Sequence, residues 1–149
     1  MEIWFYHLQH QPLERALPAL LEQWLAQGTR IVVQATSEER LDALDEALWT
    51  YADASFLAHG RERDGDAEMQ PVYLTTNVEN PNGAELRVLV DGADVAARDP
   101  MCEHTILLFD GNDADQLHAV RAQWKALKEQ GAALVYWRQS ETGQWEKRA

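Results

Sequence analysis

The order strand, helix, strand at the start of the chain restricts the possible folds more than any other feature. Glu2–Leu8 is rich in aromatic and apolar residues, as a buried strand is. Pro12 suits a first helical turn, apolar residues then recur at helical spacing, and Gly28 predicts the helix end. Pro18 either bends this helix or marks its true start. Arg30–Gln34, with "IVV" at its centre, is the next strand, and a strand–helix–strand unit implies a parallel sheet.

The rest of the chain continues this alternation. A second helix is predicted over Ser37–Tyr51, where Thr36 and Glu39 have the spacing of a capping box. Its core stripe comprises Leu41, Leu44, Leu48 and Tyr51. Further strands are predicted at Pro71–Thr76, Leu86–Val90, Thr105–Phe109 and Ala133–Arg138. Gly60–Glu68 is predicted to be a surface loop.

Two turns complete the prediction. "NPNG" at Asn80–Gly83 leads into the strand 86–90, and Asn-Gly is the usual signal of a hairpin. Gly143–Trp145 turns into a short polar tail. Several strands alternating with at least three helices predict one α/β domain over residues 1–149, with three layers and a mostly parallel central sheet flanked by helices.

Cellular location follows from what the chain contains. No charge-poor apolar run approaches the roughly 18 residues that a membrane span needs. Glu2 and the missing basic segment at the N-terminus disfavour a signal peptide. Cys102 is the only cysteine, which excludes an internal disulfide and fits a reducing compartment. We expect a cytoplasmic protein without membrane contact.

The chain lacks the usual motifs of nucleotide and metal chemistry. Neither G-x-x-x-x-G-K-[ST] nor G-x-G-x-x-G occurs, so no nucleotide cofactor is expected. Asp110, at a predicted strand end with Asp113 and Asp115 nearby, suggests a Mg²⁺ site; alternatively, Asp110 or Asn112 caps the following helix. The five histidines show no convergent zinc-binding pattern. No catalytic residue and no metal ligand is predicted.

A capped amphipathic helix in "NDADQLHAVRAQWKALKEQG", residues 112–131, concentrates the positive charge. Its apolar stripe is Leu117, Val120, Trp124 and Leu127, and Arg121, Lys125 and Lys128 fall beside that stripe. Residues 1–120 carry 7 Lys/Arg against 22 Asp/Glu, whereas residues 121–149 carry 6 against 3. This basic ridge suits an acidic ligand with an apolar end. Alternatively, it is a core helix whose cations extend from its rim.

A second surface is suggested by aromatic residues outside the core stripes. Trp49 lies about 100° from the apolar stripe of its helix, and Phe56 and Leu57 follow closely. These residues form either an exposed patch for a partner or a locally buried cluster. The net charge of −12 disfavours direct binding to duplex DNA, so nucleic acid would be reached through another protein.

Nearly the whole chain resembles the chi subunit of bacterial DNA polymerase III holoenzyme, an accessory protein of its clamp loader. The resemblance rests on six segments in the same order and spacing: "FYHL" at Phe5–Leu8, "LDEALW" at Leu44–Trp49, "SFLAHG" at Ser55–Gly60, "QPVYLTT" at Gln70–Thr76, "NPNGA" at Asn80–Ala84, and "LFDGND" through "WKALK" within Leu108–Lys128. "LDEALW" followed by "SFLAH" is the most specific pair.

The resemblance implies a Rossmann-like fold without a nucleotide-binding loop, and no catalysis. It implies a heterodimer with the psi subunit, through a patch at Trp49 and Phe56 with Leu57 beside them. It also implies that the acidic, Phe-ended C-terminal tail of single-stranded-DNA-binding protein binds the basic helix. That site falls on Arg121, Trp124 and Lys125, with the neighbouring Lys128 and Leu117.

Two other functions remain open. One is a small Mg²⁺-dependent or nucleotide-using α/β enzyme centred on Asp110. The other is a structural module whose only role is pairing through Trp49 and Phe56, with the basic ridge incidental.

Overall fold

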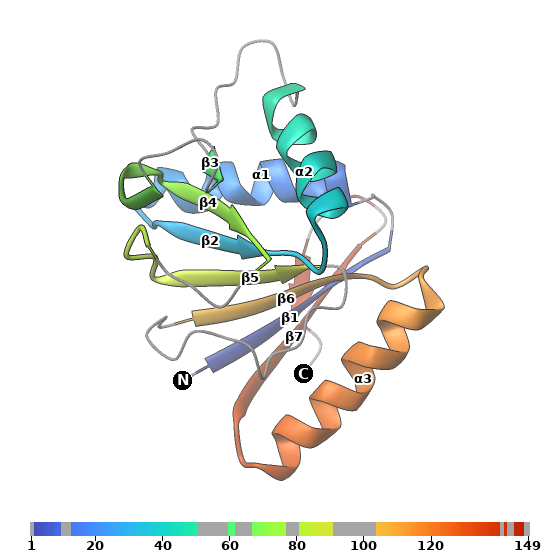
Figure 1. Ribbon diagram of the computed structural model, residues 1–149. Coiled ribbons are helices and arrows are strands. Elements are labelled where there is room, and N and C mark those ends of the chain that lie inside the picture. The colour runs from blue at the N-terminus through green and yellow to red at the C-terminus, as the bar shows by residue number, and fades with distance from the viewer. Residues whose placement is uncertain are drawn as a thin grey trace.

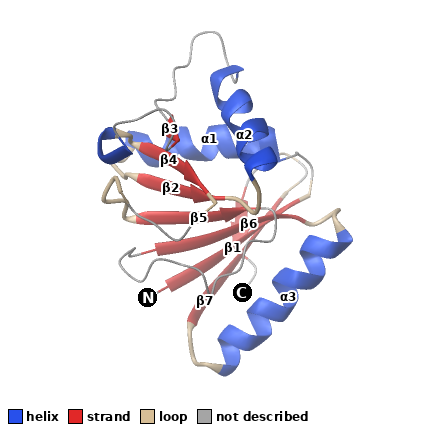
Figure 2. Ribbon diagram, viewed as in Figure 1, coloured by secondary structure: helices blue, strands red, loops and turns tan. Residues whose placement is uncertain are grey.

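The computed structural model describes residues 2–9, 13–50, 60–61, 67–76, 81–90, 104–140, 142 and 145–147. Helices and strands alternate over most of this range (Figure 2). The elements are β1 (Glu2–Leu8), α1 (Leu13–Ala26), β2 (Ile31–Gln34), α2 (Glu38–Thr50), β3 (Gly60–Arg61), the 3₁₀-helix η2 (Ala67–Met69), β4 (Val72–Thr75), β5 (Leu86–Val90), β6 (His104–Asp110), α3 (Ala114–Glu129), β7 (Ala133–Gln139) and β8 (Trp145–Lys147).

The described strands form one eight-stranded sheet in the order β3-β4-β2-β5-β6-β1-β7-β8. All neighbouring strands are parallel except β7 and β8. α1 and α2 lie together on one side of the sheet, and α3 lies apart from them (Figure 1). The prediction of a three-layer, Rossmann-like α/β fold with a mostly parallel sheet is therefore confirmed.

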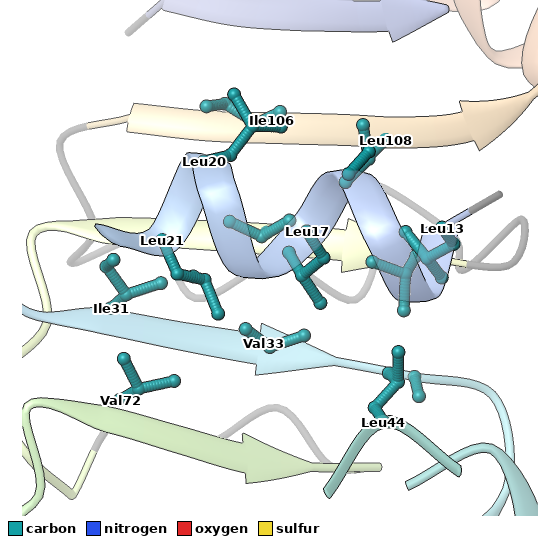
Figure 3. Close-up of a cluster of buried hydrophobic side chains, with 14 of the residues drawn as sticks. Leu13, Leu17, Leu20, Leu21, Ile31, Val33, Leu44, Val72, Ile106 and Leu108 are labelled. Atoms are coloured by element: carbon teal, nitrogen blue, oxygen red, sulfur yellow. The ribbon is translucent and has the colours of Figure 1, made fainter. Parts of the chain in front are cut away.

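The larger core lies between the sheet and the α1–α2 layer. Leu17 and Leu21 of α1 and Leu44 of α2 are fully buried there. They meet Ile31, Val33, Val72, Ile106 and Leu108 of the sheet (Figure 3). Pro18 lies inside α1 and is buried, so the helix begins before it, at Leu13. At about 25 cal/mol per Å² of apolar surface, this burial is the main stabilising contribution to the fold.

The smaller core lies under α3 and uses the opposite face of the same strands. Side chains alternate across a strand. Ile3 and Phe5 of β1 therefore join the α3 side, whereas Tyr6 and Leu8 join the α1 side. Val120 and Leu127 are the buried residues that α3 contributes.

One local prediction was wrong near the middle of the chain. The hairpin predicted from "NPNG" does not form, because β4 and β5 both pair in parallel with β2, on its two sides. Gly83 does adopt a positive φ of 64°. The buried Asn82 amide donates to the carbonyl oxygens of Ile31 (3.1 Å) and Gln70 (2.9 Å), so this turn anchors a crossover.

Three further details differ from the sequence prediction. The side chain that caps α2 is Ser37, not Thr36: its Oγ accepts the Arg40 N–H at 3.3 Å. Gly60 and Arg61, predicted to lie in a surface loop, form the buried strand β3. The predicted polar tail contains β8, because the Trp145 ring packs on Tyr6 at 4.8 Å.

Candidate partner-binding site

The carboxylates at the start of α3 are used in capping and turn contacts. Asp113 is the N-cap residue and accepts the backbone N–H groups of Asp115 (3.0 Å) and Gln116 (3.1 Å). Asp110 accepts the Asn112 N–H at 2.8 Å and so closes the preceding turn. The prediction of a cap at Asp110 or Asn112 was therefore wrong by one to three residues, although a helix cap is the correct role for this segment.

A polar cavity of about 390 Å³ opens beside this turn, at the carboxyl ends of the strands. Ligands commonly bind at this edge in α/β folds. Two of its charges already form a pair, since Arg40 donates to Glu14 at 2.8 Å. Burial raises the pKa of Glu14, but the hydrogen bond from Arg40, a backbone hydrogen bond and the charge of Arg40 together outweigh burial, so the net pKa is lowered. Within the described part of the chain, no group of three or more His, Cys, Asp or Glu could hold a metal ion.

The predicted basic ridge is present on α3. Arg121, Lys125 and Lys128 are all exposed. Across the described residues, none of these three cations forms an ion pair with a carboxylate. Their positive charge is therefore available to an external anion.

Trp124 and Leu117 give this ridge an apolar flank. Both are half-buried and pack on the smaller core. The Trp124 ring meets the Phe5 ring edge-on at 5.0 Å and the Tyr136 ring at 5.7 Å. The underlying strands thus hold one side of the indole while the other remains accessible, as a binding wall requires.

Three residues at the end of this wall were not predicted from the sequence as part of the site. The buried His7 shares a hydrogen bond of 2.5 Å between its Nδ1 and the Tyr136 hydroxyl. Arg138 is the β7 residue in register with His7. Residues two apart on a strand point to the same face of the sheet, so His7 lies on the face of Phe5, and Arg138 on the face of Tyr136. This alternation is the sequence signal that could have identified them.

Gly111 makes room for the His7 ring. A Cβ at position 111 would lie 1.7 Å from the His7 Nε2, far inside van der Waals contact. The ring has little freedom to move away, because it is bonded to Tyr136 and packs on Phe109 at 4.9 Å. The glycine in "LFDGND" is therefore required by this close approach.

The second predicted surface is only partly within the described residues. Trp49 belongs to the last turn of α2, but its side chain is not among those described. Phe56 and Leu57 lie outside the described residues. The psi-facing patch therefore remains a prediction.

Among the described residues, no helix has both the length and the apolar character needed to cross a membrane. The fold and the α3 surface define an α/β protein that presents a basic, aromatic-walled surface on one outer helix and lacks the glycine-rich loops of nucleotide binders.

Comparison with known proteins identifies the family. The family model described as "DNA polymerase III chi subunit, HolC" matches residues 1–135, and the chain belongs to this family. A probable DNA polymerase III subunit chi from Rickettsia prowazekii (strain Madrid E) is 30% identical over 91 residues. That alignment covers 61% of this chain and about half (55%) of the Rickettsia protein.

Proposed function

We propose that this chain is a non-catalytic, cytoplasmic subunit of bacterial DNA polymerase III. It links the clamp loader, through the psi subunit, to the acidic C-terminal tail of single-stranded-DNA-binding protein. Membership of the chi family supports a replication accessory role. The observation that carries the tail-binding part is the exposed row Arg121, Lys125 and Lys128 beside the half-buried Trp124.

Tail capture uses two kinds of contact. Arg121 and Lys125 meet carboxylates of the tail in charge-assisted hydrogen bonds, with Lys128 extending the positive row. Trp124 and Leu117 line the place of the terminal Phe. The affinity is modest, because a disordered tail loses conformational freedom on binding, and it falls with added salt.

The second contact is a heterodimer with psi through Trp49, Phe56 and Leu57. DNA is then reached only through partner proteins, which fits a net charge of −12. Trp49→Ala should disrupt pairing with psi and leave tail binding unchanged. Co-purification with psi measures the first effect and peptide binding the second; loss of both together would contradict two separate surfaces.

Fluorescence anisotropy tests tail binding directly. A labelled acidic peptide ending in Phe is titrated with the protein at low and moderate salt, and the same peptide without the Phe is the control. We expect binding that requires the Phe and weakens with salt. Absence of binding to both peptides would overturn the tail-binding proposal.

Thermal melting separates this proposal from the enzyme centred on Asp110. A ligand that binds the folded state raises the melting temperature by mass action. The proposed linker function predicts no shift with Mg²⁺ or with a nucleotide. The contacts of Asp110 and Asp113 within the chain favour this result.

A further inference from the structure

A second cavity, of about 270 Å³, lies at the amino ends of the strands, whereas the Asp110 turn lies at their carboxyl ends. Trp4 and Trp24 line this indole cavity, and Glu85 contributes a carboxylate to its lining. We propose that the indole cavity binds an arginine side chain of a partner polypeptide, at a surface separate from the α3 ridge.

The strand register brings the lining of the cavity together. Trp4 of β1 lies opposite Ile106 of β6, and Leu86 of β5 lies opposite His104. Ile106 points toward α1 and, like Leu86, belongs to the larger core, against which Trp4 also packs (Figure 3). Trp24 is in the last turn of α1 and completes the lining. The site is therefore on the α1 side of the sheet, and α3 packs on the other.

Tyr6 contacts both indoles and holds them in place. Its ring is nearly parallel to that of Trp4, with centroids 6.3 Å apart, and meets the Trp24 ring edge-on at 6.3 Å. Burial raises the pKa of Tyr6 to about 12, so this phenol stays neutral. Trp4 and Trp24 are only half-buried, so each is supported by the core and still accessible from outside. Indole faces held in this way attract a cation.

The charges around the cavity also favour a cation. Glu85 is exposed, and its carboxylate forms no ion pair with any residue that the structure describes. The backbone carbonyl of Arg30 accepts the Glu85 N–H, but the Arg30 guanidinium donates to the carbonyl oxygen of Glu68 at 3.2 Å. None of the described lining residues is Lys or Arg.

The end of α1 adds a further negative contribution. The aligned peptide dipoles of a helix place about half a negative elementary charge at its C-terminus. The last turn of α1, which the structure describes in full, contains no basic residue, whereas the last turn of α3 contains Lys128. A cation beside Trp24 compensates this end of α1 as Lys128 compensates the end of α3.

The shape of the cavity selects an arginine side chain. A planar guanidinium stacks on an indole while its N–H groups bond to a carboxylate, whereas the ammonium of lysine is a compact point charge. The apolar stem of arginine matches Leu86 and Ile106. The volume is below the roughly 300 Å³ at which pockets for whole small-molecule ligands begin, so it suits a single side chain.

The surroundings favour a polypeptide over a free cation. Trp4 meets the Trp137 ring at 5.8 Å, and the Trp145 ring packs on Tyr6 at 4.8 Å. Trp137 and Trp145 are also half-buried. Tryptophans grouped around a pocket are typical of protein interfaces, where Trp and Arg are both enriched. The net charge of −12 attracts a basic segment to this face.

Three peptides test the proposal by NMR titration of the indole N–H signals. They are acetylated and amidated Ala-Ala-Arg-Ala-Ala and its two versions with citrulline or lysine at the centre. Citrulline has nearly the shape of arginine but no charge. We expect the citrulline peptide to bind about tenfold more weakly than the arginine peptide, because it loses both the ion pair and the cation–π contact. The lysine peptide should fall between them.

Variants of the protein locate the site. Glu85→Gln should weaken binding of the arginine peptide about threefold, as loss of an exposed ion pair does, and leave the citrulline peptide nearly unchanged. Glu22→Gln removes the same charge at an exposed position on α1 and is the matched control, with unchanged affinity expected. Trp24→Leu should weaken the arginine peptide about threefold through the lost cation–π contact. A thermal melt of each variant verifies folding.

The possible outcomes are distinct. Equal binding of the arginine and citrulline peptides, or equal losses in Glu85→Gln and Glu22→Gln, would overturn the cation site. A lysine peptide as tight as the arginine peptide would overturn the choice of arginine. Methylguanidinium that binds as tightly as the arginine peptide would assign the cavity to a free cation and overturn the polypeptide partner.

The indole cavity and the α3 ridge are separable in the same experiments. Arg121→Ala should bind the arginine peptide like wild type, and Glu85→Gln should bind the Phe-ended acidic peptide like wild type. A loss of both peptides in either variant would contradict two independent sites.

Discussion

α1 and α3 cover opposite faces of one sheet, yet they differ greatly in how much they bury. α1 has 14 residues and buries six of them: Leu13, Ala16, Leu17, Pro18, Leu20 and Leu21. α3 has 16 residues and buries only Val120 and Leu127. The longer helix thus contributes less to the core, and its Trp124 and Leu117 are only half-buried.

This difference separates a stabilising role from a binding role. A helix that only covers a sheet gains most by burying a wide apolar stripe. α3 instead leaves three cations exposed and an indole only half-buried along one side. α1 and its core hold the sheet together, whereas the sparse burial of α3 leaves its outer surface free for the binding role that we propose for it.

The largest expected effect is on stability and belongs to α1. Leu17 is fully buried, so Leu17→Ala should lower the free energy of unfolding by about 3 kcal/mol, the usual cost of removing a core leucine. Leu117→Ala on α3 should cost about 1 kcal/mol, since its side chain is only partly removed from water. Urea denaturation measures both. Equal losses would break the contrast between the helices.

The next effect is on binding and belongs to α3. Arg121→Ala should weaken binding of the Phe-ended acidic peptide about tenfold through a lost charged hydrogen bond, with stability changed by less than about 0.5 kcal/mol. Arg15→Ala is the matched control, because Arg15 is an exposed arginine on α1. It should leave the affinity unchanged. If both variants lost affinity alike, the attraction would come from net charge and not from the α3 surface.

The contrast between the helices was visible in the sequence only in part. Helical spacing correctly predicted the stripes of both helices, because apolar periodicity is a local property of the chain. It also correctly placed Arg121, Lys125 and Lys128 together on one side. How deeply each stripe is buried depends on the sheet beneath it, and the spacing does not contain that information.

Strand pairing was the least predictable feature. Asn82-Gly83 has the composition of a hairpin turn, but β4 and β5 are separated by β2, a partner more than 35 residues earlier in the chain. Likewise, Arg138 meets His7 only because β7 pairs with β1. Such contacts are set by long-range pairing, whereas a local motif reports only the turn itself.

A smaller effect tests how α3 is held in place. Asp113 caps α3 through two backbone N–H groups, so Asp113→Ala should lower the free energy of unfolding by about 1 kcal/mol. Asp113→Asn retains a capping oxygen and should cost only a few tenths of a kcal/mol. Urea denaturation compares the two variants. A similar loss in both would assign the effect to the charge of Asp113 and not to its hydrogen bonds.

The smallest effect concerns pH and arises from the His7–Tyr136 pair beneath α3. Burial and the charges of Arg138 and Arg121 lower the pKa of His7 below its ordinary value of 6.5. Below about pH 6.5 the unfolded chain therefore binds a proton that the folded chain does not, and the unfolded state is favoured. Stability should fall as the pH drops through this range and should be insensitive to His7 above it.

Urea denaturation at pH 7.5 and 5.5, in wild type and in His7→Gln, isolates this contribution from that of the carboxylates. We expect the wild type to lose more stability than the variant on acidification. His118→Gln, at an exposed position on α3, should behave like wild type. Equal losses in His7→Gln and wild type would mean that His7 gains its proton as easily in the folded protein as in the unfolded chain.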